Sequence, residues 1–359
     1  MRIAITLSGY GYVHRGSEIM VENVVKHLQK NHVVDIFSIG CDRHCIEIKS
    51  FRRDSSFAKI FPERIQRYLE HALFALKAVY RIARRSNRYD LVWCHDGEAA
   101  MPFMKALQLL QGIPVIVTGH GGGTSDLLIS LFHPDAIVVF KPEAQKAIQK
   151  RFKNISVTQI PHGIDLEAVR NVRPDYSIIE KLDRPIIVST GALVKVKRIH
   201  LLIQAVKELK QGTLVLIGDG PLKNELQELG QNLLADRFLM LGEIPHSEVL
   251  KWLTLADVYS LASAYENFSI GLLEALAANC PVVTQYDLNR KRIVGDAGIL
   301  VNCEDTKNYA AALFNAYQTN WDNQPQKQVS NLDWAVIAQK YERLFELVLS
   351  AQPIPEEIS

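Results

Sequence analysis

The sequence lacks several features that would place it at once in a class of proteins. Its 359 residues carry 41 Lys and Arg against 39 Asp and Glu, and this net charge of +2 gives no reason to expect a nucleic-acid ligand. No uninterrupted apolar run approaches the length of about 18 residues that a transmembrane helix needs. The opening residues MRIAITLSGY contain one basic residue and a short apolar run. They predict a first strand rather than a signal peptide.

Cysteine is scarce, and its spacing is not that of a metal or redox site. The chain has five cysteines without a CxxC pair: Cys41, Cys45, Cys94, Cys280 and Cys303. This odd, scattered set predicts reduced thiols, and therefore a cytoplasmic protein.

Short, β-branched apolar runs alternate with helical patterns along the chain. Such alternation is typical of parallel sheets covered by helices on both faces, and two series of runs indicate two doubly wound domains. The predicted strands are RIAIT, VVDIFSI, LVWC, PVIVT and AIVVF in the first half, and PIIVST, TLVLIG, FLMLG, VYSLA and PVVT in the second. We therefore predict an α/β chain with Rossmann-like domains at 1–166 and 167–335.

The remaining residues, 336–359, predict a C-terminal helix that packs back on the first domain, followed by a tail. The last residues, AQPIPEEIS, are expected to be a frayed end. Doubly wound sheets bind ligands beyond the carboxyl ends of their strands, so the cleft between the two domains is the expected ligand site.

An ordered set of motifs runs through most of the chain and is densest from Pro161 to Pro281. In chain order the motifs are a glycine-rich loop with GSE, PHGID, GALVKVKRIHLLI, LIGDGPLKNEL, ENFSIGLLEALAANCPVV, RIVGDAGILV and LDWAVIAQKYERL. With this set the chain resembles the retaining glycosyltransferases of family four. The resemblance implies the GT-B fold of two facing Rossmann-like domains. The acceptor would bind in the first domain and the nucleotide-sugar donor in the second.

The segment ENFSIGLLE carries carboxylates at both ends of a run that enters an apolar helix. Backbone N–H groups at a helix start are free, and the helix dipole adds positive charge there. The residues expected to offer amides to a diphosphate are Phe268, Ser269, Ile270 and Gly271. Glu274 is expected to accept hydrogen bonds from the ribose hydroxyls, and Glu266 to face the transferred sugar. The resemblance implies the same two roles; the alternative is a capping acid and a surface helix acid.

The segment GALVKVKRIHLL follows a predicted strand and places Lys195, Lys197 and Arg198 at its end. Fixed cations stabilise the charge that develops on a departing nucleoside diphosphate. The resemblance implies an Arg after the first Gly and a Lys before a second Gly. Lys197 matches that Lys, but Ala192 stands in the Arg position and Arg198 replaces the second Gly. Arg198 and Lys195 are the candidates for the missing charge, with a solvated basic turn as the alternative.

Glycines and a histidine at other strand ends complete the predicted donor site. Gly218 and Gly220 are expected near the nucleotide, although a tight turn would need glycine in any case. The resemblance implies that the amide of Gly16 approaches the diphosphate or the acceptor. It also implies that His120 touches the donor sugar, unless this side chain only caps a turn.

Acidic residues after a third strand of the first domain are candidates for acceptor binding. Asp96 and Glu98 of DGEAAMP are suited to bind acceptor hydroxyls, and the alternative is that they are solvated loop acids. His162 of PHGID is expected to be structural.

One predicted helix of the first domain is strongly basic along one half of its helical wheel. The basic residues are Arg64, Arg67, His71, Lys77, Arg81, Arg84, Arg85 and Arg88, and Phe74 lies among them. The apolar half holds Ile65, Leu69, Ala72, Leu73, Leu76, Val79 and Ala83, and FRRDSSFAKIF lies just upstream. This composition suits an anionic membrane surface or an anionic acceptor, with Phe51, Phe57, Phe61 and Phe74 inserting. The alternative is a helix that covers the sheet with a solvated outer face.

Together these features predict a retaining glycosyltransferase of polysaccharide biosynthesis, in which Glu266, Lys197 and His120 are the catalytic candidates. It would move a sugar from a nucleoside-diphosphate sugar, most simply a UDP-sugar, to a hydroxyl of a glycan, lipid-linked or small-molecule acceptor. No cofactor is expected, since the nucleotide sugar is a co-substrate. No metal is expected either, because a DxD-type acidic pair at a strand end is lacking.

No side chain stands out as a nucleophile. The resemblance therefore implies front-face attack, in which the leaving phosphate oxygen takes the proton of the acceptor. The enzyme is expected to be cytoplasmic and peripheral on the inner membrane face.

Two other functions stay open from the sequence. A nucleotide-sugar epimerase can share the fold. The chain can also be a weakly active partner subunit of a glycan-assembly complex, which the Ala192 departure motivates.

Overall fold

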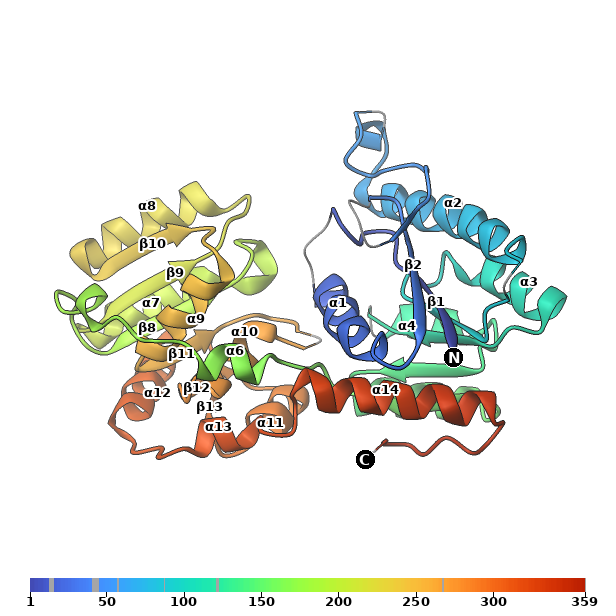
Figure 1. The fold of residues 1–359 in the computed structure, drawn as a ribbon. Coiled ribbons are helices and arrows are strands. Elements are labelled where there is room, and N and C mark those ends of the chain that lie inside the picture. The colour runs from blue at the N-terminus through green and yellow to red at the C-terminus, as the bar shows by residue number, and fades with distance from the viewer. Residues whose placement is uncertain are drawn as a thin grey trace. The chain divides into compact units, whose positions relative to one another are not determined.

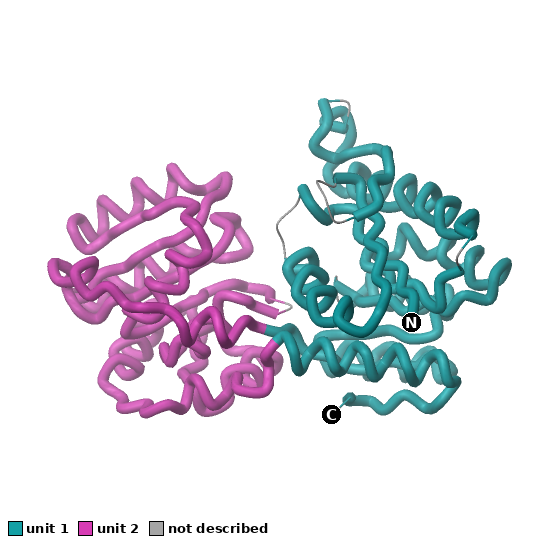
Figure 2. The backbone as a smooth tube through the Cα atoms, viewed as in Figure 1, with its two compact units in different colours: residues 1–163, 334–359 teal, residues 164–333 magenta. Residues whose placement is uncertain are grey.

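The protein is described by a computed structural model over residues 1–12, 16–40, 45–56, 58–86, 88–120, 123–266 and 268–358. Its contacts divide the chain into two compact units (Figure 2). Unit 1 comprises Met1–Gly163 and Trp334–Ser359, and unit 2 comprises Ile164–Asp333. The chain thus leaves unit 1 after Gly163 and returns to it at Trp334, at the start of its last helix.

Unit 1 is built on a seven-stranded parallel sheet with the order β3-β2-β1-β4-β5-β6-β7. Figure 1 labels β1 and β2 of this sheet. Its strands are β1 (Arg2–Thr6), β2 (Val33–Ser38), β3 (Ile46–Glu47), β4 (Leu91–Cys94), β5 (Val115–Thr118), β6 (Ala136–Val139) and β7 (Ser156–Gln159). The central strands β4, β5 and β6 are buried along their whole length. This burial explains their near-continuous apolar sequence.

Helices connect the parallel strands of unit 1. They are α1 (Gly16–Leu28), α2 (Glu63–Ala83), α3 (Met101–Gln111), α4 (Thr124–Ser130), α5 (Pro142–Arg151) and α14 (Trp334–Leu349), with a short 3₁₀ turn η1 (Ala58–Ile60). Parallel strands require such crossovers, because the chain must return to the same end of the sheet before each strand.

The C-terminal residues are held against unit 1. On α14, the Tyr341 ring lies 4.6 Å from the ring of Trp93 in β4. Beyond the helix, Gln159 N donates to Glu356 O at 2.9 Å, and Ile358 is 3% exposed. The prediction of a frayed tail is therefore wrong. The tail satisfies backbone groups at the β7 edge of the sheet, a role that its proline-rich sequence does not reveal.

Helix α2 covers the sheet with the face that contains Phe74, Ala78 and Ile82, all at most 2% exposed. The prediction that Phe74 inserts into a membrane is therefore wrong, since this side chain belongs to the core of unit 1. Phe51 and Phe61 are half-buried. Phe57 lies outside the described residues.

Unit 2 is built on a six-stranded parallel sheet with the order β10-β9-β8-β11-β12-β13. Its strands are β8 (Ile186–Thr190), β9 (Thr213–Ile217), β10 (Phe238–Gly242), β11 (Val258–Leu261), β12 (Val282–Gln285) and β13 (Gly298–Val301). The order reverses at β8 and β11, which are neighbours. This is the switch point at which such sheets bind ligands.

The helices of unit 2 lie between these strands in sequence. They are α6 (Leu166–Arg170), α7 (Ile199–Leu209), α8 (Lys223–Leu234), α9 (His246–Leu255), α10 (Ile270–Ala277), α11 (Leu288–Val294), α12 (Thr306–Gln318) and α13 (Gln324–Gln328). Short 3₁₀ turns are η2 (Tyr176–Ile178), η3 (Lys195–Lys197) and η4 (Ala235–Arg237). The predicted α/β fold with two doubly wound sheets is confirmed.

Two further findings bear on the predicted cellular setting. Cys45 is disulfide-bonded, so the prediction of reduced thiols is wrong for this residue, whereas Cys94, Cys280 and Cys303 are free. Within the described residues, no helix combines the length and the apolar character that a bilayer crossing would need.

Candidate functional site

The carboxyl ends of β8 and β11 in unit 2 bring two of the predicted catalytic residues together. Lys197 ends the turn η3 that follows β8, and Glu266 lies in the segment that follows β11. Lys197 Nζ lies 2.5 Å from Glu266 Oε1, and the two side chains are 21% and 13% exposed. The fold therefore builds a half-buried ion pair at the switch point of the sheet.

Helix α10 begins beside this ion pair, after the N-cap residue Ser269. A side chain at Gly271 would collide with β8 and β11, because a Cβ atom there would lie 2.4 Å from Thr190 Oγ1 and 2.6 Å from Tyr259 Oη. Glycine thus lets the helix start approach the strand ends closely. Of the predicted amide donors, Ile270 and Gly271 are the first residues of this helix, Ser269 is its N-cap, and Phe268 precedes the cap.

Glu274 lies one turn into α10 and is 8% exposed. Its Oε1 lies 2.6 Å from Nε2 of His246, the first residue of α9. The hydrogen bond to Glu274 raises the pKa of His246. The interpretation of Glu274 as a surface helix acid is therefore wrong. Its role toward a ribose stays a prediction.

Arg198 is held in place by three acceptors. Its guanidinium donates to Ala262 O, to Gln285 Oε1 and to Glu304 Oε1, each at 2.8 Å. Its backbone is left-handed, with φ of 49°, which explains why glycine also suits this position. By contrast, Lys195 and Ala192 are exposed.

Arg290 of α11 is a cation near this site that our sequence analysis missed. It is 1% exposed, and burial lowers its pKa. Nη1 donates to Gln285 O at 3.2 Å, whereas Nη2 has no hydrogen-bond partner among the described residues. Glu266 and Arg198 are among the charges that act on it. Only its place after a strand end could have pointed to it.

Gly218 and Gly220 have a structural reason for being glycine. Gly218 has a φ of 138°, and a Cβ atom there would lie 2.0 Å from the carbonyl oxygen of Gly191. A Cβ atom at Gly220 would lie 2.7 Å from Leu193 N. Both residues thus permit the loop after β9 to touch the loop after β8. A nucleotide contact at either residue stays a prediction.

Unit 1 contains a polar cavity of about 610 Å³ at the carboxyl ends of its strands. Parts of α1, α2 and α4 and the loops after β1, β4 and β5 line it. Its charged and titratable lining residues are Glu18, Arg53, Arg64, Arg67, Tyr68, His71, His95, Asp96, Glu98 and His120. Three predicted site residues of the first domain, Asp96, Glu98 and His120, therefore share one cavity.

Two histidines meet on the wall of this cavity. His95 Nδ1 lies 2.9 Å from His120 Nε2, and the rings stack with centroids 5.2 Å apart. Burial lowers the pKa of His120 to about 4 and also lowers the pKa of His95. His95 Nε2 is buried without a hydrogen-bond partner among the described residues. Sequence analysis missed His95, although it follows the strand LVWC directly.

The two acidic candidates differ in their surroundings. Asp96 is 1% exposed, and its Oδ1 accepts from Ser8 N at 2.7 Å. Its Oδ2 is buried without a partner among the described residues, and burial raises the pKa of this carboxyl. Glu98 Oε2 accepts from Ser125 Oγ at 2.5 Å. The interpretation of Asp96 as a solvated loop acid is therefore wrong.

Gly16 is the first residue of α1. Its carbonyl lies 3.1 Å from Nε2 of His162, which is 4% exposed. This contact ties the segment PHGID to the start of α1 and agrees with a structural His162. A donor contact of Gly16 stays a prediction.

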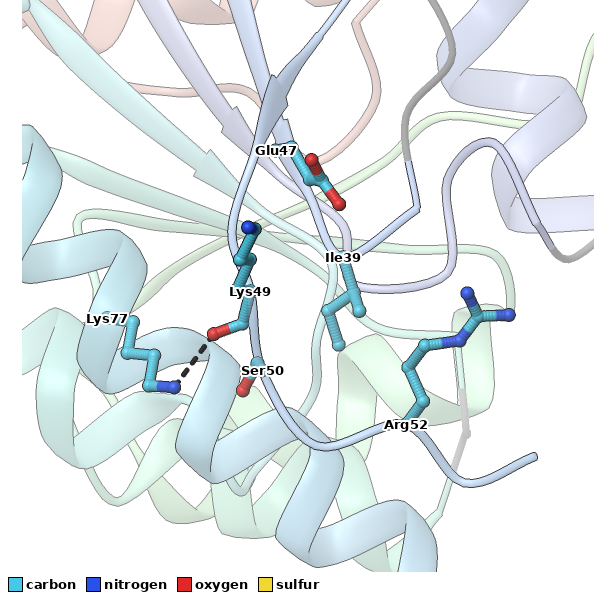
Figure 3. A pocket seen from close by; sticks show the side chains of 6 residues that line it. All are labelled: Ile39, Glu47, Lys49, Ser50, Arg52 and Lys77. Atoms are coloured by element: carbon cyan, nitrogen blue, oxygen red, sulfur yellow. Dashed lines mark hydrogen bonds between the residues drawn. The ribbon is translucent and has the colours of Figure 1, made fainter. Parts of the chain in front are cut away.

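A second hollow of unit 1, of about 400 Å³, lies between α2 and the segment that follows β3 (Figure 3). Its lining residues are Ile39, Glu47, Lys49, Ser50, Arg52 and Lys77. Lys77 Nζ donates to Lys49 O at 2.7 Å, as the dashed line in Figure 3 marks. Basic side chains thus lie on this side of α2 as well. In the described part of the chain, no group of three or more His, Cys, Asp or Glu is placed to hold a metal ion.

Comparison with solved structures defines the class of fold. Sucrose-phosphate synthase from Thermosynechococcus elongatus has a TM-score of 0.80 at 20% identity, over 98% of this chain and 100% of that chain. HepE from Anabaena, in complex with UDP and glucose, has a TM-score of 0.71 at 16% identity, over 96% of this chain and 99% of that chain. The fold is GT-B.

Comparison of sequences gives the family. The model of Glycosyltransferase Family 4 matches residues 14–168, and the model of Glycosyl transferases group 1 matches residues 176–331. The chain belongs to the family four glycosyltransferases.

Two curated relatives illustrate the range of similar proteins. One is N-acetylgalactosamine-N,N'-diacetylbacillosaminyl-diphospho-undecaprenol 4-alpha-N-acetylgalactosaminyltransferase from Campylobacter jejuni, with 32% identity over 50% of this chain. The other is phosphatidyl-myo-inositol mannosyltransferase from Mycobacterium leprae, with 24% identity over 76% of this chain and 78% of that protein. The match spans half the length of the Campylobacter protein.

Proposed function

We propose that this chain is a retaining glycosyltransferase that transfers a sugar from a UDP-sugar to a hydroxyl group. The observation that carries the proposal is the grouping of Lys197, Glu266, Glu274 and the start of α10 at the β8 and β11 ends of unit 2. A cation, helix amides and a carboxylate are the groups that a leaving diphosphate and a ribose require.

In the proposed reaction, the bond between the anomeric carbon and the diphosphate oxygen breaks as the acceptor oxygen attacks from the same face. The departing oxygen takes the acceptor proton. Lys197 and the amides at the start of α10 stabilise the charge that develops on the diphosphate. Glu266 is held by Lys197 and binds hydroxyls of the sugar. These protein charges are expected to replace a metal ion.

A panel of nucleotide sugars, offered with and without acceptor extracts, tests the proposal. We expect one UDP-sugar to be consumed with release of UDP, the product anomer to have the donor's configuration by NMR, and activity to persist in EDTA. Inversion of configuration would refute the retaining mechanism. Conversion of the donor to its epimer without acceptor would favour an epimerase, and no consumption above background would favour a partner subunit.

The enzyme is also proposed to bind anionic membrane surfaces at the cytoplasmic side through α2. The outer face of this helix exposes Ile65 by 46%, Leu73 by 40%, Leu76 by 49% and Tyr80 by 57%. These residues recur at helical spacing, and exposed Lys77, Arg81 and Arg84 lie beside them. Apolar side chains flanked by cations are typical of helices that lie in a membrane interface.

Sedimentation with vesicles tests this second proposal. Binding to vesicles with anionic lipid is expected to weaken in the R81Q/R84Q variant, because each cation near such a surface contributes about 1 kcal/mol. The L73S/L76S variant is expected to weaken the part of binding that survives high salt. The K146Q/K150Q variant, which removes two exposed charges of α5, serves as the control. Wild-type protein that ignores anionic vesicles at low salt would refute it.

A further inference from the structure

Three basic residues of α2 line the polar cavity of unit 1. Arg64, Arg67 and His71 are spaced at i, i+3 and i+7 on α2, and all three line the cavity. None of them forms an ion pair with a residue that the structure describes. Arg53, which also lines the cavity, is by contrast bound to the fully buried Glu70, with Nε 2.8 Å from Oε1.

The same face of α2 is basic in the first half of the helix and apolar in the second half. Its first half carries Arg64, Arg67 and His71 over the cavity, and its second half carries Phe74 and Ala78 in the core. A solvated basic face would point away from the sheet. Arg64 and Arg67 are exposed and His71 is half-buried, but all three lie on the side of the helix that carries Phe74 and Ala78, and all three line the cavity.

The cavity also offers a hydrogen-bond acceptor without a donor. Asp96 is 1% exposed, and its Oδ2 has no hydrogen-bond partner among the described residues. The neighbouring acids are already satisfied in part, since Glu18 accepts from Ser17 Oγ at 2.7 Å and Glu98 accepts from Ser125 Oγ. A buried carboxylate oxygen without a donor is costly unless a ligand or water supplies one.

We propose that this cavity binds an acceptor that carries a phosphoryl group, with the phosphoryl oxygens on Arg64 and Arg67 and a sugar hydroxyl on Asp96 Oδ2. His71 lies on the same wall and adds a further donor. Guanidinium groups suit this task because they bind phosphoryl oxygens through two parallel hydrogen bonds. A cavity of about 610 Å³ has the size of an ordinary small-ligand site. This inference rests on the proposed glycosyltransferase function and adds the chemical class of the acceptor.

The phosphoryl group can come from a soluble sugar phosphate or from a sugar linked to a lipid through a diphosphate. The structure favours the lipid-linked source. The helix that supplies Arg64 and Arg67 also exposes Leu73, Leu76 and Tyr80 on its outer face. A lipid-linked acceptor would present its phosphoryl group next to the membrane surface that this outer face is proposed to touch.

Calorimetry with the full chain saturated with UDP tests the proposal. The soluble probes are hexose 1-phosphates, hexose 6-phosphates and the parent hexoses, and the lipid probe is a polyprenyl diphospho-sugar in neutral detergent micelles. We expect binding of a phosphorylated probe and no binding of the parent hexoses. The R64Q/R67Q variant is expected to bind the phosphorylated probe at least about tenfold to a hundredfold more weakly. A loss of that size is typical when one charged hydrogen bond is removed. The K146Q/K150Q variant should bind as wild type.

The D96N variant separates the two halves of the proposed contact. It should weaken binding of the sugar-bearing probes and leave the weaker binding of inorganic phosphate unchanged. If only the lipid probe binds, the lipid-linked source is supported. If parent hexoses bind as well as their phosphates, or if R64Q/R67Q binds as wild type, the inference is overturned. Such a result leaves the proposed function intact as long as the protein binds UDP and consumes a UDP-sugar. A protein that neither binds UDP nor consumes a UDP-sugar would instead refute the proposed function.

Discussion

At the strand ends of unit 2, Glu266 and Glu274 each pair with a basic side chain, whereas several charged groups in the cavity of unit 1 are unpaired among the described residues. In unit 2, Lys197 contacts Glu266, and His246 contacts Glu274. In unit 1, Arg64 and Arg67 have no ion-pair partner, and Asp96 Oδ2 has no hydrogen-bond donor, among the described residues. Both groups of residues lie at the carboxyl ends of parallel strands, so topology alone does not explain the difference.

The difference indicates two ways of preparing a site. Paired charges orient each other, so a ligand of unit 2 meets groups whose geometry is already set. In unit 1 the unpaired, buried Oδ2 of Asp96 instead lowers the stability of the free protein, and that free energy is recovered when a ligand supplies a hydrogen-bond donor. Under the proposed function, the paired charges of unit 2 suit charge that develops during a reaction, and the cavity of unit 1 suits recognition of an acceptor in its ground state.

The largest expected effect is on turnover by the K197A variant. If Lys197 stabilises charge on the leaving diphosphate, its removal should lower kcat by about a hundredfold to a thousandfold, in line with the loss of one preorganised transition-state contact. The Michaelis constant for the donor should change much less. Steady-state kinetics with the accepted UDP-sugar measures both constants.

The K207A variant is the control for this experiment, because Lys207 is an exposed lysine of α7 and no ion pair of it is described. It should retain most of the activity. A loss in K197A that falls equally on donor affinity and rate constant would mean that Lys197 is a ground-state phosphate contact.

Acidification should destabilise unit 1 more than unit 2. Burial lowers the pKa of His120 from 6.5 to about 4 and lowers that of His95. As the pH falls from 6.5 to 4, the unfolded chain takes up protons that the folded unit refuses, so stability is lost. A tenfold difference in proton affinity corresponds to about 1.4 kcal/mol. In unit 2 the pKa of His246 is raised, so this residue affects the pH dependence of stability in the opposite direction.

The stabilisation that the folded state gains from protonated His246 is present below pH 6.5, and it is lost as the pH rises through the raised pKa.

Hydrogen exchange followed by mass spectrometry measures each unit separately, with peptides from β4 and β5 for unit 1 and from β8 and β11 for unit 2. The H120Q variant should flatten the acid response of unit 1. Asp96 opposes the histidines, because burial raises its pKa, so D96N should make the acid loss steeper. Equal acid responses of the two units in the wild type would contradict the comparison.

The next effect is on nucleotide binding by the E274A variant. Loss of a charge-assisted hydrogen bond to a ribose should cost about 1.5–3 kcal/mol, or about tenfold to a hundredfold in affinity. Calorimetry with UDP measures this loss. The H246A variant should lose less, because His246 only orients Glu274. Unchanged affinity in E274A would leave the Glu274–His246 pair as a structural contact between α9 and α10.

Much of this comparison could be predicted from the sequence, because it depends on local patterns. The β-branched runs predicted both sheets, and strand-end positions pointed to Lys197, Glu266, His120 and Asp96. The short strands β3, β7 and β13 were missed, since their few residues carry no distinct periodicity. The pairing of Glu274 with His246 joins residues 28 positions apart, and no pattern in either segment reveals it.

Helix α2 shows why the rest could not be predicted. The helical wheel correctly separates basic from apolar residues, but hydrophobicity predicts that the apolar half is buried. In the structure Phe74 and Ala78 on the basic half are buried, while Leu73 and Leu76 are 40% and 49% exposed. Which side of α2 is buried depends on the sheet beneath the helix and on the pairing of Arg53 with Glu70. These are long-range features that the sequence of the helix does not contain.

The smallest expected effect, and the sharpest test of the paired site in unit 2, is restoration of the family arginine with the A192R variant. Ala192 is exposed, and Gly191 beside it is exposed as well, so a longer side chain has room. Stability should therefore change by less than about 0.5 kcal/mol, as is usual for surface substitutions.

Because the guanidinium of Arg198 is occupied by Ala262, Gln285 and Glu304, the new arginine should not compete with it. We expect kcat/KM to stay equal or to rise. In the K197A background, the same substitution should restore part of the lost turnover. A sharp loss of activity in A192R alone would show that Arg198 or Arg290 already fills the place of the missing cation, and that the site of unit 2 was rebuilt around a buried arginine.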